Sequence, residues 1–486
     1  MEQEKTFYLT TPIFYPNAKL HLGHAYVMTL ADTLARAKRG AGVKTYFLAG
    51  SDENTQKMVD AAGKAGKEPL EFLKAIVDNF TNLYKELDIS YDQFIRTTDD
   101  KKHWPGATMI WNRLAEAGDL YKKEYEGLYC VGHEMFISEK DLIDGKCPDH
   151  DTPPERIKEE NYFFRLSRFG GAIKAKIESG ELKVVPESRK NEILAFIDRG
   201  LEDVSFSRPK KRGWPEGLGV PVPGDDSQVM YVWCDALANY VSALGYGTEE
   251  DALFKQFWPA NVHIIGKDIL RFHAAIWPAM LISAGLPLPK TIFAHGIITS
   301  GGRKMSKSLG NVIDPQDLIE KYGTDAVRYY LLRHVSPFED GDLTHESFHD
   351  AYTANLANGL GNLVARTMTL AEEHLPHPVE LTEEDEKLDA VFAEKIENFR
   401  FNEAMDLVFA MIGEADGIMT ERAPYKGIKS GDAVEREAAR KDIEELVRRL
   451  AKISAHLAPA LPRTSAAISS AVRKNHKPDN LFPRIA

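Results

Sequence analysis

The first fifty residues alternate between two hydrophobic periods, and this pattern constrains the fold most. Residues 6–14 are rich in β-branched and aromatic side chains, which is typical of a buried strand. From Leu20 the apolar residues recur at helical spacing until Gly40, and residues 45–49 are predicted to form the next strand. A strand, a helix and a strand with short connections predict a parallel sheet, whose ligands bind at the carboxyl ends of the strands.

The rest of the chain divides by composition and period. Further strands are predicted at residues 229–233, 262–265 and 291–294. The stretch 116–225 interrupts the α/β pattern with many Pro, Gly and charged residues, so we expect a separate small domain there. From about residue 350 onward, helical periodicity predicts an α-helical bundle, for example at residues 401–412 and 438–456.

Length and charge set limits on partners. A chain of 486 residues is too long for one hydrophobic core, so we expect several domains. Its 61 basic and 73 acidic residues leave a net charge of −12, so a polyanion would have to meet a local basic patch. Residues 208–212, 303–307 and 473–474 are such patches, although each could be plain solvated surface.

Hydropathy and cysteine content indicate a compartment. No apolar run is long enough to cross a bilayer, and the polar, acidic N-terminus does not resemble a secretory signal. Three cysteines are an odd number and too few for a disulfide scaffold. We therefore expect a cytoplasmic protein with no membrane association.

Two histidines mark the start of the first predicted helix, in the segment His21-Leu22-Gly23-His24. At positions i and i+3, their imidazoles can share a face beside the positive end of the helix dipole. Gly23 would let a nucleotide approach the backbone, and imidazole donors can stabilise charge on a phosphorus centre. The alternative is a pair of polar surface histidines.

A second motif occupies residues 301–308, where two glycines precede Lys304 and Lys307. A mobile loop of this kind can close over a triphosphate and neutralise departing pyrophosphate, although an ordinary basic loop would look the same. The chain has no G-x-x-x-x-G-K-[ST] segment, which disfavours a P-loop ATPase.

Together the two motifs resemble the HIGH and KMSKS signatures of class I aminoacyl-tRNA synthetases, and the resemblance covers nearly the whole chain. Four segments are similar to those of methionyl-tRNA synthetases: residues 11–15, 50–54, 231–237 and 266–273. The resemblance implies a Rossmann-type enzyme that uses ATP with Mg²⁺ to convert L-methionine to methionyl-adenylate. The methionyl group then passes to the 3′ adenosine of tRNA(Met), including the initiator tRNA.

The resemblance also implies roles for individual residues. Asp52 would pair with the substrate ammonium, Arg208 would hold Asp52, and Asp268 would meet the ATP ribose. His21 and His24 would act at the α-phosphate beside Gly23, and Lys304 and Lys307 at the β/γ end. The side-chain pocket would consist of Ile13, Tyr15, Trp233, Ala236, Tyr240, Ile269 and His273. Such a pocket suits a flexible, polarizable thioether, although Trp233 on its predicted strand could instead be plain core.

The interrupting stretch contains two C-x₂-H pairs, Cys130 with His133 and Cys147 with His150. Four such ligands fit a closed tetrahedral site for one structural Zn²⁺, with no open position for a catalytic water. A coincidence of two cysteines and two histidines in a polar loop is the alternative. The stretch is also too short for a large hydrolytic editing domain, which favours methionine over isoleucine, valine or leucine.

In the helical region, residues 355–366 resemble the anticodon-reading helix of the family. Asn362 and Arg366, four residues apart, would share one face and could hydrogen-bond unstacked bases. Tyr425 stands where the family usually has Trp, and it could either stack on a base or pack inside the bundle. Because no added C-terminal domain follows, we expect a monomer.

These expectations define five segments. They are residues 1–115 and 226–292 for the two halves of the catalytic domain, 116–225 for an inserted connective domain with a zinc knuckle, 293–349 for the KMSKS loop and stem-contact region, and 350–486 for an α-helical anticodon-binding domain. The rival hypotheses are another class I synthetase and a non-catalytic RNA-binding paralogue.

Overall fold

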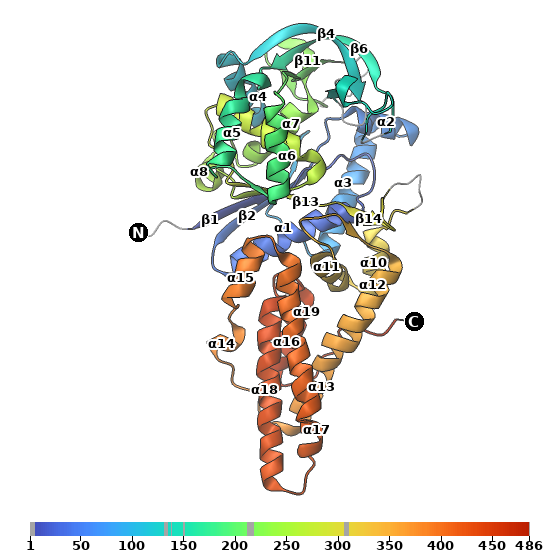
Figure 1. Ribbon diagram of the computed structural model, residues 1–486, viewed down its shortest axis with the longest axis vertical. Helices are drawn as coiled ribbons and strands as arrows, with labels where there is room; N and C mark the ends of the chain where they lie inside the picture. The colour runs from blue at the N-terminus through green and yellow to red at the C-terminus, as the bar shows by residue number, and fades with distance from the viewer. Residues whose placement is uncertain are drawn as a thin grey trace. The chain divides into compact units, whose positions relative to one another are not determined.

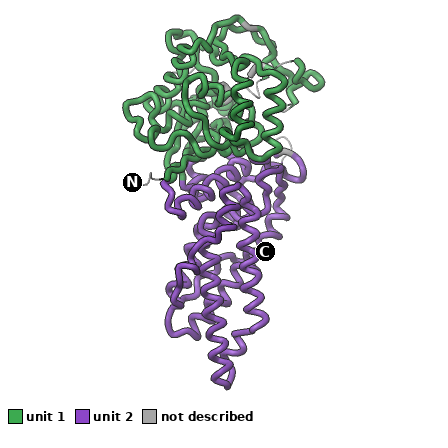
Figure 2. Tube along the Cα trace, turned by 60° about the vertical axis from the view of Figure 1, so that its left-hand side comes forward, with its two compact units in different colours: residues 1–19, 45–80, 91–294 green, residues 20–44, 81–90, 295–486 purple. Residues whose placement is uncertain are grey.

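The computed structural model describes residues 5–130, 135–137, 139–148, 151–210, 218–305 and 311–485. The chain forms two compact units, shown in different colours in Figure 2. The first comprises residues 1–19, 45–80 and 91–294, and the second comprises residues 20–44, 81–90 and 295–486. Neither unit is a continuous stretch of sequence.

The first unit is built on a six-stranded sheet with the order β3-β2-β1-β12-β13-β7. Strand β1 pairs in parallel with β12, and the pairs β2–β3 and β13–β7 are also parallel. On one side of β1 the chain runs outward through β2 to β3, and on the other side it forms the edge strand β7 first, then β12 beside β1, and finally β13 between β7 and β12. The β1/β12 junction is therefore a topological switch point. The strands are β1 (Thr6–Thr10), β2 (Lys44–Ser51), β3 (Gln93–Arg96), β7 (Lys183–Val185), β12 (Val262–Gly266) and β13 (Thr291–His295).

Most of the expected strands are confirmed, with β1 shorter than expected, but the strand expected at residues 229–233 is confirmed only at its first two residues and is wrong beyond them. Strand β11 (Asp225–Met230) ends earlier, and helix α7 (Val232–Ser242) begins two residues later. Tyr231 is the extended residue that caps the helix. The reason for the error is burial: all but one of the α7 residues are buried, so the segment lacks the one-sided pattern of an amphipathic helix. Trp233 consequently lies on a helix.

The stretch 116–225 contributes its own sheet and also part of the main one. A four-stranded sheet has the order β5-β4-β6-β8, and Figure 1 shows β4 and β6 as long neighbouring strands. Between β6 and β8 the chain forms β7, which pairs with β13 at the edge of the main sheet. The elements are β4 (Leu120–Cys130), β5 (Met135–Ile137), β6 (Glu155–Phe164), α5 (Gly170–Glu178), α6 (Glu187–Asp198), β8 (Val204–Ser205), β9 (Ser207–Pro209) and β10 (Pro221–Val222).

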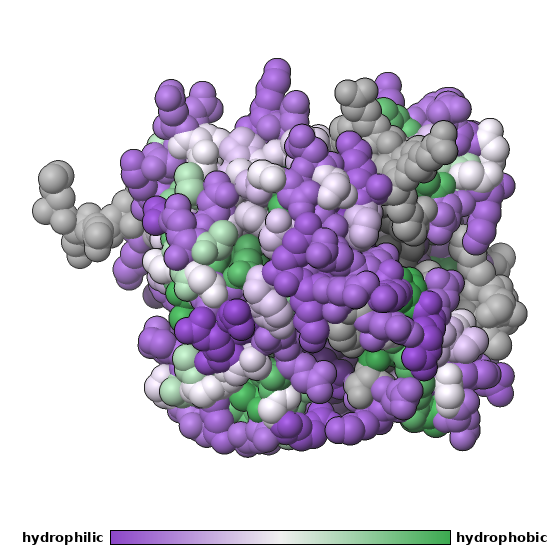
Figure 3. Space-filling model, turned by 90° about the horizontal axis from the view of Figure 1, so that it is seen from above, coloured by the Kyte–Doolittle hydropathy of each residue, from purple (hydrophilic) through white to green (hydrophobic). Residues whose placement is uncertain are grey.

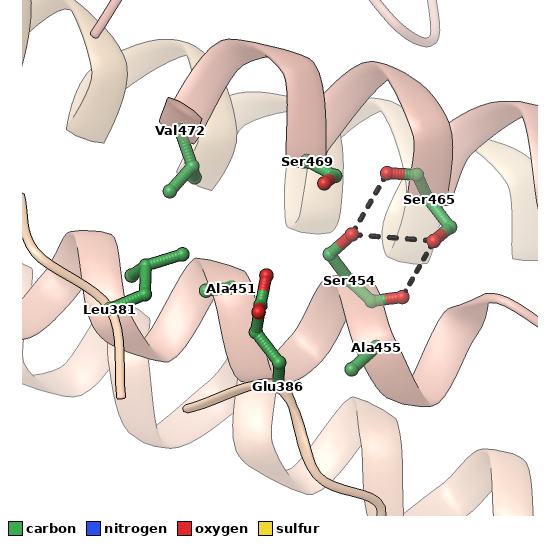
Figure 4. Close-up of a pocket in the computed structure, with 8 residues that line it drawn as sticks. All are labelled: Leu381, Glu386, Ala451, Ser454, Ala455, Ser465, Ser469 and Val472. Atoms are coloured by element: carbon green, nitrogen blue, oxygen red, sulfur yellow. Dashed lines mark hydrogen bonds between the residues drawn. The ribbon is translucent and has the colours of Figure 1, made fainter. Parts of the chain in front are cut away.

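The second unit contains the expected helical bundle. Figure 1 shows α16, α18 and α19 running alongside one another, with α13 beside them. Helices α18 and α19 are joined by a reciprocal pair of bonds, because each hydroxyl of Ser454 and Ser465 donates to the other's carbonyl oxygen at 2.8 Å (Figure 4). The helices are α13 (Asn362–His374), α16 (Phe401–Glu421), α18 (Ala433–Leu457) and α19 (Pro462–Lys474).

A buried arginine ties helix α1 (Leu22–Gly40) to the rest of this unit. Arg328, in α11 (Thr324–Arg333), is fully buried and lies 2.7 Å from the Asp32 carboxylate of α1. Its guanidinium also donates to the carbonyl oxygens of Leu87, Pro459 and Ala460. Burial alone would raise the pKa of Asp32, but Arg328 and Arg36 hold that pKa below its ordinary value.

The surface of the chain is mostly hydrophilic on the face that Figure 3 shows. Hydrophilic residues dominate the face in Figure 3, and apolar residues form only small separate groups on it. Within the described ranges, every helix is too short or too polar to cross a lipid bilayer.

Candidate active site

Helix α1 begins at the first motif, as expected. His21 is its N-cap, with extended backbone angles, and its Nδ1 accepts the Gly23 N–H at 3.0 Å. In return, the Nδ1 of His24 accepts the His21 N–H at 3.1 Å. This reciprocal arrangement is a capping box built from two imidazoles, whose ring centroids are 3.9 Å apart.

The caps determine the protonation of both rings. An Nδ1 that accepts a hydrogen bond carries no proton, so each neutral imidazole carries its proton on Nε2. Burial, reinforced by His21, lowers the pKa of His24 well below its ordinary value, which keeps this ring neutral. Two Nε2–H donors at a helix N-terminus are suited to a phosphate oxygen.

Gly23 is required by the same geometry. A Cβ at this position would lie 3.0 Å from Cε1 and 3.2 Å from Nδ1 of His21. With any other residue, the His21 ring would have to give way by a few tenths of an ångström.

In the first unit, the residues expected to bind methionine follow the carboxyl ends of three adjacent strands. Ile13 and Tyr15 follow β1, Asp52 follows β2, and Ile269 lies in a 3₁₀ turn directly after β12. Asp268 is in the same turn and is exposed. The switch point of the sheet therefore brings together groups that are far apart in sequence.

Helix α7 and a π-helical segment at Phe272–Ile276 supply the aromatic residues expected in the methionine pocket. His273 bonds through Nδ1 to the Ile269 carbonyl oxygen at 3.0 Å and through Nε2 to the Tyr240 hydroxyl at 2.7 Å. Since the carbonyl can only accept, Nδ1 carries the proton and the Tyr240 hydroxyl donates to Nε2. Trp233 stacks on Phe272 with ring centroids 3.7 Å apart.

Burial keeps this cluster neutral. It lowers the pKa of His273 to about 4, against the opposing bond to the Ile269 carbonyl. It also raises the pKa of Tyr240 far above its ordinary value, and the charge of Asp52 adds to this rise. Tyr8 of β1 holds the cluster from behind, because its hydroxyl donates to the Tyr240 carbonyl oxygen at 2.8 Å.

Asp52 is buried, and its backbone N–H donates to the Phe14 carbonyl oxygen at 2.9 Å. Arg208, on β9, holds its guanidinium over the rings of Tyr129 and Tyr231, at 4.3 and 5.0 Å from their centroids. The expected support of Asp52 by Arg208 stays a prediction. Ala236 lies on α7 between Trp233 and Tyr240, on the same face of the helix.

The lysine motif begins on a tight hairpin of the second unit. Strand β14 (Ile298–Ser300) pairs with β15 (Arg303–Lys304), and the turn glycines Gly301 and Gly302 have φ of 63° and 70°, which favour glycine. Asp342 accepts the Gly302 N–H at 3.0 Å and so anchors the turn. Lys304 is the last residue of β15, and Lys307 lies outside the described residues.

Half of the expected zinc site is described. Cys130 is the last residue of β4 and is buried. Cys147 is also buried, and its backbone forms an isolated antiparallel β-bridge with Thr152. His133 and His150 lie outside the described residues. Among the residues that the structure does describe, no group of three or more His, Cys, Asp or Glu is placed to hold a metal ion.

The residues expected to read the anticodon are on the second unit. Asn362 is the first residue of α13 and is exposed, and Arg366 follows one turn later, 3.2 Å from Asp416 of α16. Tyr425, in the short helix α17 (Pro424–Gly427), has 38% of its surface exposed. The alternative of a tyrosine inside the bundle is therefore wrong.

One buried group was missed by sequence reasoning. His103 and Asp235 form a hydrogen bond in the interior of the first unit, and Asn54 bonds to the same carboxylate. These residues are separated by 132 and 181 positions, so no local pattern could have joined them.

Comparison with known proteins places the chain in a family. The model for tRNA synthetases class I (M) matches residues 7–152 and 140–368. A methionine–tRNA ligase of Caldanaerobacter subterraneus subsp. tengcongensis is 44% identical over 472 residues, covering 95% of this chain and 73% of that protein. One from Clostridium tetani is 41% identical over 513 residues, covering 99% and 79%.

Solved structures agree. Mycobacterium tuberculosis methionyl-tRNA synthetase in complex with methionyl-adenylate superposes with a TM-score of 0.88 at 35% identity, covering 99% of both chains. The apo form of that enzyme gives a TM-score of 0.84 at 32% identity with the same coverage. The chain belongs to the methionine–tRNA ligases, a family of class I tRNA synthetases.

Proposed function

We propose that this protein joins L-methionine to tRNA(Met) in two steps, with ATP and Mg²⁺ as the activating substrate. The names of its relatives and the adenylate bound to the mycobacterial enzyme support this function. The observation that carries it is the hydrogen bond between the uncharged side chains of Tyr240 and His273. This bond lies in an aromatic cluster close enough to Asp52 for that carboxylate to raise the pKa of Tyr240.

The cluster matches the chemistry of methionine. A carboxylate suits the substrate ammonium, and the uncharged rings of Trp233, Tyr240 and His273 suit a thioether, whose sulfur gains from aromatic contact. Ile13, Tyr15, Ala236 and Ile269 complete the proposed pocket. Arg208 is proposed to support Asp52.

In the first step, a methionine carboxylate oxygen attacks the α-phosphorus of ATP, and the bond to pyrophosphate breaks. The Nε2–H groups of His21 and His24 stabilise charge at the α-phosphate, where Gly23 allows close approach. Lys304 and Lys307 neutralise the β/γ end, and Asp268 meets the ribose. No protein nucleophile is needed, so catalysis is positioning and charge stabilisation.

In the second step, a ribose hydroxyl of the 3′ adenosine attacks the activated carbonyl, and AMP leaves. We propose that Asn362, Arg366 and Tyr425 select the tRNA through its anticodon. The support is that all three lie on one helical region, where Asn362 and Tyr425 are exposed, Arg366 is half-buried, and the Tyr425 ring is available for stacking.

We also propose one structural Zn²⁺ held by Cys130, His133, Cys147 and His150. Two buried thiols, Cys130 at the end of β4 and Cys147 in an isolated β-bridge, supply the soft ligands that zinc prefers. The metal content of the purified protein tests this proposal. We expect one zinc per chain in the wild type and none in the double variant Cys130→Ser, Cys147→Ser. A monomeric state and a cytoplasmic location stay predictions from the sequence, and sedimentation velocity tests the first.

The decisive experiment is amino-acid-dependent ATP–pyrophosphate exchange without tRNA, with the twenty standard amino acids tested singly. Exchange with methionine alone is expected. Exchange with another amino acid would keep the class I chemistry and overturn the pocket, and no exchange at all would revive a non-catalytic RNA-binding protein.

A further inference from the structure

Helix α7 has two different faces. Trp233, Ala236 and Tyr240 follow one another at intervals of three and four residues and form the face that contributes to the methionine pocket. Asp235 and Ser242, seven residues apart, lie on another face. This second face is polar and yet completely buried, so its bonds must come from the protein interior.

Those bonds run to His103, the N-cap residue of helix α4 (Trp104–Glu116), and to the loop after β2. One oxygen of the Asp235 carboxylate bonds Nε2 of His103, whose Nδ1 lies 2.8 Å from the Ser242 hydroxyl. The other oxygen accepts the Asn54 amide N–H at 2.6 Å. Each of these four side chains is at most 6% exposed.

Asn54 is fixed on three sides. Its amide nitrogen also donates to the Thr97 carbonyl oxygen at 3.1 Å, and its amide oxygen accepts the Gly219 N–H at 2.8 Å. Asn54 therefore joins three segments that are distant in sequence, and it lies only two residues after Asp52.

The residue between them is equally constrained. The buried Glu53 carboxylate accepts bonds from Ser51 at 2.5 Å, from Arg96 at 2.7 Å and from Thr98. Its backbone N–H donates to the Thr97 hydroxyl at 2.8 Å. The loop that carries Asp52 thus has little freedom to shift relative to β3.

Helix α7 packs closely against helix α4. A Cβ at Gly106 of α4 would lie 2.5 Å from the Ser242 Cβ, so only glycine permits the observed contact. The bond between Asn54 and Asp235 then links a fixed loop directly to a fixed helix.

We propose that Asn54 and Asp235 are positioning residues that set the distance between the Asp52 carboxylate and the pocket face of α7, and thereby the length of side chain that the enzyme accepts. This inference rests on the proposed function, because an amino acid must hold its ammonium at Asp52 while its side chain reaches α7. The bond between Asn54 and Asp235 would thus fix the space available to the substrate side chain. One methylene more or less in an apolar pocket changes the preference between two substrates by about 10- to 200-fold.

The test uses ATP–pyrophosphate exchange with methionine, with S-methylcysteine, which is one methylene shorter, and with ethionine, which is one longer. In the full-length Asn54→Asp variant, a carboxylate would face Asp235. We expect the KM for methionine to rise about tenfold, more than kcat falls, and the preference for methionine over both analogues to drop by about tenfold.

Rescue distinguishes a direct bond from general damage. In the double variant Asn54→Asp, Asp235→Asn, an amide again donates to a carboxylate across the same gap, but the bond to the Thr97 carbonyl stays broken, so KM and preference should return part of the way. A double variant with no recovery relative to Asn54→Asp would overturn the direct link. Asn54→Ala, which removes the bond without adding charge, repeats the test if the charged variant does not fold.

Asp119→Asn is the matched control. Asp119 is a buried carboxylate of the same unit that pairs with Arg168 and accepts the Ser283 hydroxyl at 2.7 Å, and it contacts neither Asn54 nor α7. Since the bonds described for its carboxylate run to Arg168 and Ser283, the substitution should lower thermal stability and leave KM and preference unchanged.

The outcomes separate the two hypotheses. If the wild type shows no methionine-dependent exchange, the proposed function fails. If the wild type exchanges and the folded Asn54 variants keep both the wild-type KM and the wild-type preference, the positioning role alone is overturned.

Discussion

His21 and His24 use one ring nitrogen each for a helix cap and keep the other for the phosphate contact that we propose. Ordinary N-caps are Ser, Thr, Asp or Asn, whose oxygens are consumed by the cap. An imidazole has two nitrogens, so Nδ1 can close the capping box while Nε2–H faces a ligand. The i, i+3 spacing predicted a shared helix start, but the reciprocal cap depends on the backbone angles of His21, which the sequence does not specify.

Replacing Gly23 tests this geometry. In Gly23→Ala, the new Cβ would crowd the His21 ring, so one donor would be misplaced. We expect methionine-dependent exchange to fall by about 10²- to 10³-fold at saturation, as for the loss of one transition-state donor, with the KM for methionine little changed. Gly40→Ala, in the same helix with nothing within 4 Å of the new Cβ, should leave exchange unaltered. Equal losses in both variants would contradict the role of Gly23.

His273 should make stability depend on pH. Its pKa is about 4 in the folded protein and about 6.5 in an unfolded chain, because burial disfavours the imidazolium. The unfolded chain therefore binds a proton first as the pH falls, and the free energy of unfolding should decrease between pH 6.5 and 4 by up to about 1.4 kcal/mol per pH unit. In His273→Gln this contribution disappears, so urea unfolding of the variant should show a flatter pH dependence. Parallel curves for variant and wild type would count against it.

At the scale of elements, α7 shows why buried helices escape sequence reasoning. Helix α1 was predicted nearly to its ends, because Gly40 and Gly42 bound a clear helical period. In α7 the opposite face is also buried, and its polar residues Asp235 and Ser242 are satisfied by partners from α4 and the β2 loop. The family resemblance therefore suggested a pocket role for this segment, whereas its local pattern predicted the wrong secondary structure.

Arg328 should be the main anchor of α1. Removing it in Arg328→Met would leave the buried Asp32 carboxylate without its guanidinium and would strip donors from three carbonyls. Breaking such a buried pair costs about 3–5 kcal/mol. Urea unfolding should show this loss in the second unit.

Arg463→Met is the comparison for that loss. Arg463 pairs with Asp88 at 2.5 Å, but 55% of its side chain is exposed. Exposed ion pairs contribute about 0–1 kcal/mol, so a loss as large as that of Arg328→Met would contradict the buried role.

At the scale of the whole molecule, the sequence predicted the class of fold, the helical bundle and the family. It did not predict that β7 would leave the stretch 116–225 to join the main sheet, because a three-residue strand carries almost no periodic signal. Nor did it predict the contact between His103 and Asp235, since partners across 132 residues meet only in the folded chain.

Replacing Tyr425 tests whether this residue acts only in tRNA binding and not in methionine activation. In Tyr425→Ala, kcat/KM for tRNA aminoacylation should fall by about 5- to 150-fold, since stacking of a base on an aromatic ring contributes about 1–3 kcal/mol. Exchange without tRNA should not change. Val434→Ala, an apolar truncation at a site that is 75% exposed, should affect neither assay. A loss of tRNA-free exchange in Tyr425→Ala would refute a role confined to tRNA.

The partnership of Asp32 and Arg328 also has a consequence during synthesis. Asp32 leaves the ribosome roughly 300 residues before Arg328, which at 5–20 residues per second is a delay of about 15–60 s. Through this interval the Asp32 carboxylate of the nascent α1 can pair only with Arg36 of its own helix and lacks its second guanidinium partner. The helix that bears both motif histidines can therefore reach its native setting only late in translation.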